Sequence, residues 1–352
     1  MKKLFLESML LAAFGFFATQ TISATSWRIH HDANKNPHFT DLNAAMSSSD
    51  VVDGDTLYLD PGCTLSSNQT VTKQVTIVGC GYFRDGAPHS IATISGKIYL
   101  KAANIKMEGV LVTGDTQFQA EHVTLERCKL EYVNLSNSSS IKCHYATIRQ
   151  CYVRRIICTV GTSNIKNAYD ATIENCIIRN TTGTALSDLS RATIRNNFIY
   201  AKGRYNSYDY FAVTNMSECT ITNNIIITSD TGHHNDNFRS MTNCTISHNV
   251  LSANAETYPA YATDNYCLGS NDLSLVFAQE GSNDAVYQLT AESPAKGYAD
   301  DGGDCGAFDG PYPYVLSGMP YGYPYYTGNI NVSSTVRNGK VNVSLQIQVQ
   351  DE

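Results

Sequence analysis

The chain has 352 residues and a formal net charge of −7, and only 16% of its residues are charged. An acidic chain is unsuited to general binding of nucleic acid, because phosphate backbones attract clusters of Lys and Arg. The hydrophobic fraction of 42% excludes a wholly disordered chain. Gly, Asn, Ser and Thr are plentiful, which is typical of an all-β protein rich in turns.

The first 24 residues are typical of a secretory signal peptide. Lys2 and Lys3 form its positive end, residues 10–18 form a short apolar run, and Ala24 is a small residue suited to cleavage. That run is far shorter than the roughly 20 residues that a membrane helix needs. We therefore expect an exported protein, secreted or at the cell surface, without a membrane span.

A seven-residue phrase recurs along the chain. It has Thr first, Ile or Leu second, Cys or Asn fifth and an aliphatic residue seventh. Six clear copies start 21–27 residues apart, at Thr124, Thr147, Thr172, Thr193, Thr220 and Thr245. Degenerate copies start at Thr76, Thr93 and Lys106. One copy cannot bury its apolar side alone, but stacked copies join those sides into a continuous core.

This period predicts one solenoid coil per copy. Since the phrase of leucine-rich repeats is absent, we predict an all-β, right-handed parallel β-helix of about nine coils, over residues 25–310. The second and seventh columns should point inward. The fifth column should form left-handed turns, with Asn side chains that hydrogen-bond along the rod.

The 11 cysteines are an odd number, so they cannot all pair in disulfides. Cys128, Cys151 and Cys176 occupy the fifth column, and Cys219 and Cys244 precede the first Thr of their copies. Positions set by the repeat favour small buried thiols over disulfides. Because no pair has Cys-x-x-Cys spacing, we expect no metal site.

The third column alternates in charge, as Glu126, Arg149, Glu174 and Arg195. These side chains would be acids and bases in a catalytic interpretation. We favour a surface ladder that fixes the register of the coils, since opposite charges one coil apart lie at pairing distance. Each exposed pair should contribute only a fraction of a kcal/mol.

Both ends of the rod need caps. At the start, Phe39, Leu42 and Met46 have helical spacing, with Thr40 as the expected N-cap, and a turn and the first strand follow at residues 52–62. Residues 311–326 are rich in Tyr and Pro, and form either packing along the rod or a sugar-stacking surface. Residues 330–349 alternate around Asn338-Gly339, which predicts a terminal β-hairpin that closes the rod or serves as a docking tail.

Two phrases resemble a known family. Asp-Gly-Asp-Thr-Leu-Tyr-Leu-Asp-Pro-Gly at residues 53–62, after a short amphipathic helix, is similar to the opening of bacterial secreted proteins with the pectin lyase-like β-helix. Leu-Thr-Ala-Glu-Ser-Pro-Ala at residues 289–295 and Asp-Cys-Gly-Ala-Phe at residues 304–308 are similar to their closing phrase. The resemblance covers residues 27–310 and implies fold and export. This architecture serves lyases, hydrolases, adhesins and structural proteins, so it does not specify a function.

Loops of adjacent coils supply the candidate site residues. Arg154 and Arg155 leave the second clear copy, and Lys166 and Asp170 close that loop. From the loops at residues 200–217 and 228–240 we select Asp209, His233, Asp236 and Arg239 as catalytic candidates. From the same loops we select Arg204, Tyr205, Tyr208, Tyr210 and His234 as ligand-binding candidates. Aromatic rings beside Asp, His and Arg suit a carbohydrate site.

The resemblance implies two kinds of catalysis. Lyases take a proton next to a uronic carboxylate with Lys or Arg while a cation or basic group neutralises that carboxylate, and hydrolases use paired Asp or Glu residues. The Gly-His-Gly and paired-Asp phrases of pectin hydrolases are absent here, and no lyase base motif is recognised. Whether the protein is an enzyme therefore stays open.

Our hypothesis is a monomeric secreted or cell-surface protein that contacts a polysaccharide or surface glycan through its loops, with no established catalytic activity. One alternative is a polysaccharide lyase or glycoside hydrolase with a divergent site. The other is a structural or adhesive surface protein that attaches through its terminal hairpin. We expect no cofactor, except Ca²⁺ if the protein is a lyase.

Overall fold

The computed structural model describes residues 24–83, 91–135, 142–158, 169–205, 208–229, 237–256, 263–281 and 283–322, with residues 324–326, 331–332, 340, 343–344 and 347–349 beyond. At residues 204–205 and 208–209 only the backbone is described. The predicted signal peptide lies outside the described residues except for Ala24.

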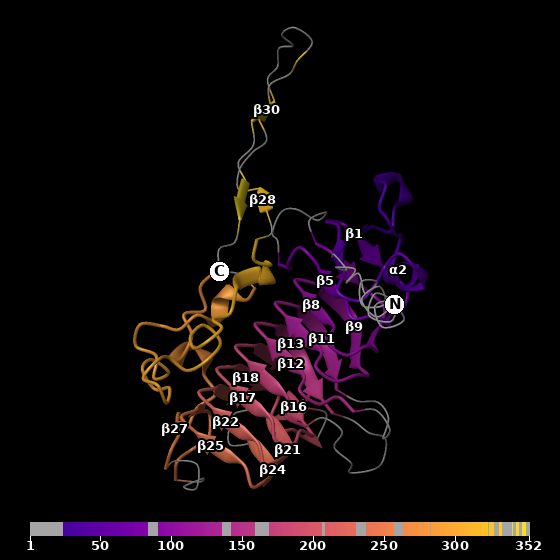
Figure 1. Ribbon diagram of the computed structural model, residues 1–352. Coiled ribbons are helices and arrows are strands. Elements are labelled where there is room, and N and C mark those ends of the chain that lie inside the picture. The colour runs from indigo at the N-terminus through magenta and orange to yellow at the C-terminus, as the bar shows by residue number, and fades with distance from the viewer. Residues whose placement is uncertain are drawn as a thin grey trace, which may run out of the picture.

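Ten short strands form one continuous parallel sheet, the first sheet (Figure 1). Its strands pair in the order β1 (Ser26–Ile29), β2 (Thr56–Leu59), β5 (Thr76–Val78), β8 (Lys106–Glu108), β10 (Thr124–Glu126), β12 (Thr147–Arg149), β14 (Thr172–Glu174), β17 (Thr193–Arg195), β22 (Thr220–Thr222) and β25 (Thr245–Ser247). The register places each Thr beside the Thr of the next copy, as in Thr147 against Thr172.

Fifteen strands form the second sheet, which is also parallel. Its main path is β3 (Thr64–Leu65), β6 (Thr93–Ile94), β9 (Leu111–Phe118), β11 (Lys129–Asn134), β13 (Tyr152–Ile157), β15 (Ile177–Asn180), β18 (Phe198–Ala201), β23 (Ile225–Thr228), β26 (Val250–Leu251) and β27 (Tyr266–Cys267). Two branches leave it: β4 (Gln69–Val71) with β7 (Ile98–Leu100), and β16 (Leu186–Ser187) with β21 (Val213–Ser217) and β24 (Phe238–Thr242).

The fold is the predicted parallel β-helix. The second column is buried inside the rod, apart from the partly exposed Ile246, and so is the seventh column. The first sheet has ten strands, one more than the predicted nine coils. Two strands, β1 and β2, precede the copies found in the sequence. One copy, at Thr93, was wrong, since β6 belongs to the second sheet and pairs with β3 and β9.

The left-handed turn lies one residue earlier than predicted. The fourth column, not the fifth, has positive φ values of 49–60°, at Arg127, Gln150, Asn175, Asn196, Asn223 and His248. A single left-handed residue turns the chain from the first sheet into the second. Asn tolerates that conformation best among these types, whereas Arg and Gln are held there by their neighbours in the stack.

The fifth column forms the predicted ladder inside the rod. The amide oxygen of Asn224 accepts from the backbone N–H and the side-chain Nδ2 of Asn197, both at 2.9 Å. Asn224 donates in turn to Asn249, and Asn249 donates to Asn265. All these residues are buried, so each satisfied amide also fixes the register of its coil.

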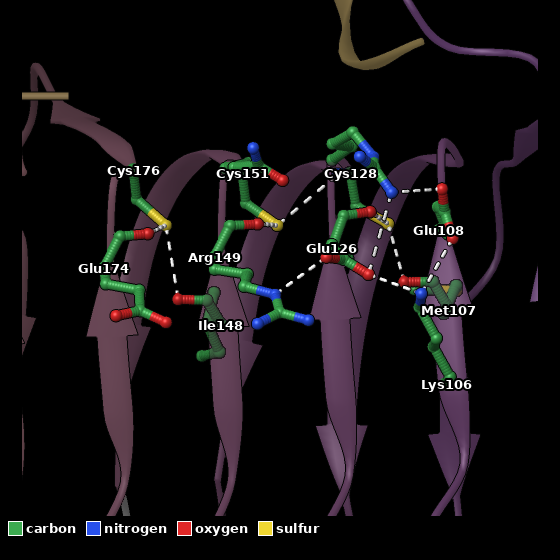
Figure 2. Close-up of polar contacts among 12 residues, drawn as sticks. Lys106, Met107, Glu108, Glu126, Cys128, Ile148, Arg149, Cys151, Glu174 and Cys176 are labelled. Atoms are coloured by element: carbon green, nitrogen blue, oxygen red, sulfur yellow. Dashed lines mark hydrogen bonds and ion pairs between the residues drawn. The ribbon is translucent and has the colours of Figure 1, made fainter. Parts of the chain in front are cut away.

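Thiols continue this column where Asn is absent. Cys128, Cys151 and Cys176 are buried, and their Sγ atoms donate to backbone carbonyls at 3.2–3.3 Å (Figure 2). The buried-thiol prediction is confirmed for these three residues. All 11 cysteines are thiols in the structure.

A short helix, α2 (Leu42–Ser47), covers the first coils beside β4, after the 3-10 turn η1 (Ala33–Lys35). Its N-cap is Asp41, whose carboxylate accepts from Ala44 N at 2.7 Å, and not the predicted Thr40. Leu42 is buried, and its N–H donates to the Gln69 side chain at 3.0 Å. The predicted cap is therefore present but starts later in the chain.

Residues 271–322, here called the strap, run alongside the rod rather than across its end (Figure 1). The strap contains three 3-10 turns, η2 (Leu273–Leu275), η3 (Ala285–Tyr287) and η4 (Leu316–Gly318). Its Phe277, Tyr287 and Tyr314 cover outward apolar residues of the sixth column, which are Ile177, Phe198, Ile225 and Val250. The phrase expected to close the rod therefore covers its flank.

The left-handed residues of the fourth column form the corner where the strap docks, here called the docking line. Gln150 donates to Pro313 O at 2.7 Å, and Asn175 donates to Ala307 O at 3.0 Å. Asn223 exchanges two hydrogen bonds with Asp300, of 2.7 and 3.1 Å. The fourth column therefore serves the strap, while the fifth column serves the interior of the rod.

Beyond the strap, a two-stranded antiparallel ribbon projects away from the rod (Figure 1). In it β28 (Pro324–Tyr326) pairs with β31 (Ile347–Val349), and β29 (Asn331–Val332) pairs with β30 (Val343–Ser344). This agrees with the predicted hairpin, although the Asn338-Gly339 turn lies outside the described residues. In the part of the chain that the structure describes, no helix is both long and apolar enough to cross a membrane.

Candidate functional site

The outer face of the first sheet carries a connected set of ion pairs (Figure 2). Glu126 lies at its centre and contacts Lys106 Nζ at 2.5 Å and Arg149 Nε at 2.7 Å. The Glu108 carboxylate pairs with Lys106 at 3.0 Å and with Arg127 at 2.5 Å. Two coils further along, Arg195 pairs with Glu174 at 2.7 Å. Each carboxylate on this face therefore has a cation within contact distance.

This ladder is more buried than the sequence suggested. Glu126, Arg127 and Glu174 are at most 4% exposed. The strap covers part of the face, since Tyr321 stacks on Arg127 at 3.8 Å and Tyr312 on Arg149 at 4.3 Å. Burial alone would raise the pKa of Glu126, but its cationic neighbours outweigh burial and hold that pKa below the usual value. A paired, covered carboxylate of this kind supports structure and is unsuited to acid–base catalysis.

The outer face of the second sheet is different. Its sixth, eighth and ninth columns place four cations, Lys129, Arg154, Arg155 and Arg179, on the neighbouring strands β11, β13 and β15. Three rings accompany them, Tyr132, Tyr152 and Tyr200. We call these seven residues the basic strip. Strand alternation explains positions six and eight, which flank an inward residue and so point outward. The ninth position, held by Tyr132 and Arg155, breaks the alternation, because the next buried residues are Val133 and Ile156.

The rings and cations of the basic strip contact one another. The Arg154 guanidinium lies 5.2 Å from the Tyr132 ring centre, and the Arg179 guanidinium lies 5.1 Å from that of Tyr200. Lys129 Nζ lies over the Phe83 ring at 4.1 Å. Such contacts hold the cations in place by ring faces, and Arg154 is fixed further by hydrogen bonds from its guanidinium to Glu131 and, at 2.7 Å, to Thr182.

A pocket of about 160 Å³ opens within the strip on β9, β11 and β13. Leu111, Thr113, Lys129, Glu131, Tyr152 and Arg154 are among the residues that line it. Its size suits a single ring or a carboxylate group rather than a large ligand. The charged groups at its rim are Lys129, Arg154 and Glu131.

Cations outnumber the carboxylates that face the basic strip. Arg154 pairs with Glu131 across a half-exposed contact. Asp188 lies close enough to Arg155, and Asp284 to Lys129, to favour their charged forms. Burial nevertheless lowers the pKa of both Arg155 and Lys129. Among the described residues, the Nε atoms of Arg155 and Arg179 are buried without a hydrogen-bond partner.

Asp284 belongs to the strap, and other strap residues hold its carboxylate. Its Oδ2 accepts from Tyr314 Oη at 3.0 Å and from Ser317 N at 2.6 Å. Tyr314 also contacts Tyr82 Oη at 2.6 Å. Burial raises the pKa of Asp284, and its two donors oppose that shift. This carboxylate therefore ties parts of the strap together and only partly balances Lys129, while Tyr314 makes the contact to Tyr82 of the rod.

The structure describes the side chains of only two of the selected candidates. Tyr210 lies near Arg155, close to the basic strip. Arg239 is exposed on β24 over the Phe211 ring at 5.2 Å, on the branch sheet and not on the strip's strands. The backbone of Arg204, Tyr205, Tyr208 and Asp209 forms the small antiparallel pair β19 (Arg204–Tyr205) and β20 (Tyr208–Asp209). His233, His234 and Asp236 lie outside the described residues.

The candidates from the loop after the second clear copy also lie in different places. Arg154 and Arg155 belong to the basic strip. Asp170 instead pairs with Arg191 at 2.8 Å, at the corner that precedes the first sheet. Lys166 lies outside the described residues. Within those residues, no group of three His, Cys, Asp or Glu side chains is arranged to hold a metal ion.

Sequence reasoning missed Lys129, Tyr152 and Arg179. Lys129 and Tyr152 hold the sixth position of their copies, and Arg179 directly follows the seventh, so strand alternation was the available signal. Each of these residues looks like an ordinary strand position, whereas the long loops carry conspicuous clusters of polar residues.

Comparison of the chain with known protein families gave no matching family, and comparison with curated proteins gave no similar protein.

Proposed function

We propose that this protein is an exported β-helix protein of the pectin lyase-like kind that binds an acidic polysaccharide along the basic strip. The observation that carries the proposal is a row of four cations, Lys129, Arg154, Arg155 and Arg179, with tyrosine rings between them and three nearby carboxylates, those of Glu131, Asp188 and Asp284. In a chain of net charge −7, such a row needs a reason of its own. A ligand bearing carboxylates supplies one.

The spacing of the coils fits this ligand class. Neighbouring coils lie about 4.8 Å apart, which is close to the length of one pyranose unit. A uronic acid chain lying along the rod would therefore bring one carboxylate to each coil. Arg154 and Arg179 hold the eighth position of adjacent coils, and guanidinium groups bind carboxylates in two-pronged contacts. Tyrosine rings offer flat apolar faces to the C–H faces of the sugars.

Binding of immobilised and soluble polyuronates to the mature chain tests the proposal. We expect saturable binding that weakens with salt, since the contacts are ionic and partly exposed. Changing Arg154 and Arg179 to Gln should each weaken binding about tenfold. The matched control is Arg191→Gln, which removes an exposed arginine from the opposite corner. Equal binding by all three variants, or no binding of any polyuronate, would contradict the proposal.

A second candidate function is cleavage of such a chain by β-elimination. The observation in its favour is Lys129, an amine at the pocket rim whose pKa is lowered by burial. A neutral amine there would take the proton next to the uronate carboxylate, while Arg154 pairs with that carboxylate. The bond from C4 to the leaving sugar oxygen would break as the C4–C5 double bond forms, and that oxygen would take a proton from water. Growth of unsaturated uronide absorbance, lost in Lys129→Met while binding persists, is the expected result, and its absence in the wild type would leave binding alone.

Attachment through the terminal ribbon stays a prediction. Its strands β28 and β31 form only a two-stranded sheet, and such sheets are marginally stable by themselves. A partner strand on an exposed edge would stabilise it. Deleting residues 330–352 should abolish surface retention if the ribbon is the attachment element, and unchanged retention would exclude that role.

A further inference from the structure

A second pocket, of about 190 Å³, lies between the strap and β23, away from the pocket of the basic strip. It is bounded by Ile225 of the rod and otherwise by strap residues. An apolar cavity of about 150 Å³ holds a benzene molecule. The strap pocket is therefore large enough for one six-membered ring.

The smaller part of the strap pocket lining is apolar and is here called its base. Ile225, Phe277, Tyr287, Ala307 and Phe308 form it. The Phe277 and Tyr287 rings meet edge to face at 5.7 Å, so one ring plane turns across the other. Four of these five residues also belong to the buried cluster that fixes the strap to the rod, and Phe308 packs against that cluster. The pocket wall is thus held by the same packing that holds the strap.

The rim of the strap pocket is polar. Lys296 Nζ contacts Asp304 Oδ2 at 3.3 Å, with 45% and 31% of these side chains exposed. The other Asp304 oxygen accepts from Gly297 N at 2.9 Å. Asp309 accepts from the N–H groups of Asp304 and Gly310, at 2.6 and 2.8 Å. The backbone therefore orients both carboxylates before any ligand arrives, and Gln288 adds an exposed amide to the lining.

The charge of this rim is the reverse of that on the basic strip. Two carboxylates, Asp304 and Asp309, face one cation, Lys296. Burial, with the nearby carboxylates Asp304, Asp300 and Asp301, raises the pKa of the Cys305 thiol to about 12, so this cysteine stays protonated. An anionic ligand is disfavoured here, and the buried Cys305 thiol is not a thiolate nucleophile.

We propose that the strap pocket binds a single uncharged pyranose unit. The apolar base takes the C–H face of the ring, and Gln288, Lys296 and Asp304 bind neighbouring hydroxyl groups at the rim. A Lys beside an oriented carboxylate supplies a donor and an acceptor side by side, which is the pattern that two adjacent hydroxyls require. Most of the pocket lining is polar, as a ligand covered with hydroxyl groups requires. This site needs no acidic polysaccharide, although Tyr287 of its wall contacts Tyr152 and Arg179 of the basic strip.

The mature full chain can be titrated with methyl hexosides, and methyl glucuronide serves as the anionic comparison. Saturation-transfer NMR and calorimetry report binding directly. We expect saturable binding of at least one neutral glycoside. Gln288→Ala and Lys296→Met should each weaken it about fivefold, the loss of one hydrogen-bonding group. Preference for the glucuronide, or no saturable binding of any neutral hexoside, would overturn the proposal.

Two controls separate this site from the other features. Lys35→Met removes an exposed lysine far along the chain and should leave hexoside binding unchanged. The double variant Arg154→Gln with Arg155→Gln, which removes two cations of the basic strip, should also leave it unchanged. If that double variant abolishes hexoside binding, the hexoside occupies the strip and the strap pocket is not its site.

Discussion

The two outer faces of the rod use the same kinds of charged residue for different purposes. On the first sheet, Glu126 and Glu174 alternate with Arg149 and Arg195, and each carboxylate has its cation. On the second sheet, the eighth column begins in the same way, with Glu131 paired to Arg154 one coil on. It then places a second cation, Arg179, beside Arg154, where like charges repel. An alternating column stabilises the stack by itself, whereas two adjacent cations do not, and a ligand carboxylate would balance them.

The largest effect should come from breaking the paired face. Glu126→Ala leaves Lys106, Arg127 and Arg149 without their shared anion, and a buried charge that loses its partner costs about 3 kcal/mol or more. Arg154→Ala on the second face should cost less than about 1 kcal/mol, because its pair is half exposed. Urea unfolding of the two variants measures the difference. Equal losses would mean that the faces do not differ in this way.

The ladder inside the rod should come next. Asn224 donates to Ile194 O, Thr222 O and Asn249, and accepts from Asn197. Replacing it with Ala leaves several buried groups unpaired, at about 2–3 kcal/mol. Asn224→Cys restores the residue type found at Cys176 in the same column, and should recover part of that loss. If Cys and Ala were equally destabilising by thermal melting, thiols would not be substitutes for Asn in this column.

The docking line of the strap should show a smaller effect. Asn223→Gly keeps the left-handed backbone at φ 60° but removes the two hydrogen bonds to Asp300, at about 1–2 kcal/mol. Asn243→Gly is the matched control, since Asn243 is also left-handed, at φ 52°, and exposed. Limited proteolysis of the strap should become faster only in Asn223→Gly. Unchanged cleavage would show that the corner does not hold the strap.

The smallest effect concerns pH. Because the pKa of Asp284 is raised above its usual 3.8 in the folded state, folding favours its neutral form. The stability that Asp284 contributes through this shift is complete below pH 3.8, and it is lost as the pH rises through the raised pKa of the folded state. Asp284→Asn keeps the contacts to Tyr314 and Ser317 and removes the titration. The difference in melting temperature between variant and wild type should therefore change in the variant's favour with rising pH, and a flat difference would contradict this.

The sequence by itself determined the coil. The period, the inward second and seventh columns and the Asn and Cys column all follow from alternation within a strand, which is local and repeats in every copy. It placed the left-handed turn one residue late, because Asn at both positions of 196–197 and 223–224 made the two columns look alike.

Only the tertiary structure decided what lies against the rod. Gln150 meets Pro313, and Tyr321 covers Arg127, across separations that no local pattern encodes. Tyr321 on Arg127 and Tyr312 on Arg149 cover part of a ladder that looked fully exposed. The same strap covers the apolar sixth column at Ile177 and Phe198 but leaves Lys129 and Arg154 at a pocket. Burial and the balance of charge depend on which distant segment covers each coil, and folding alone sets that.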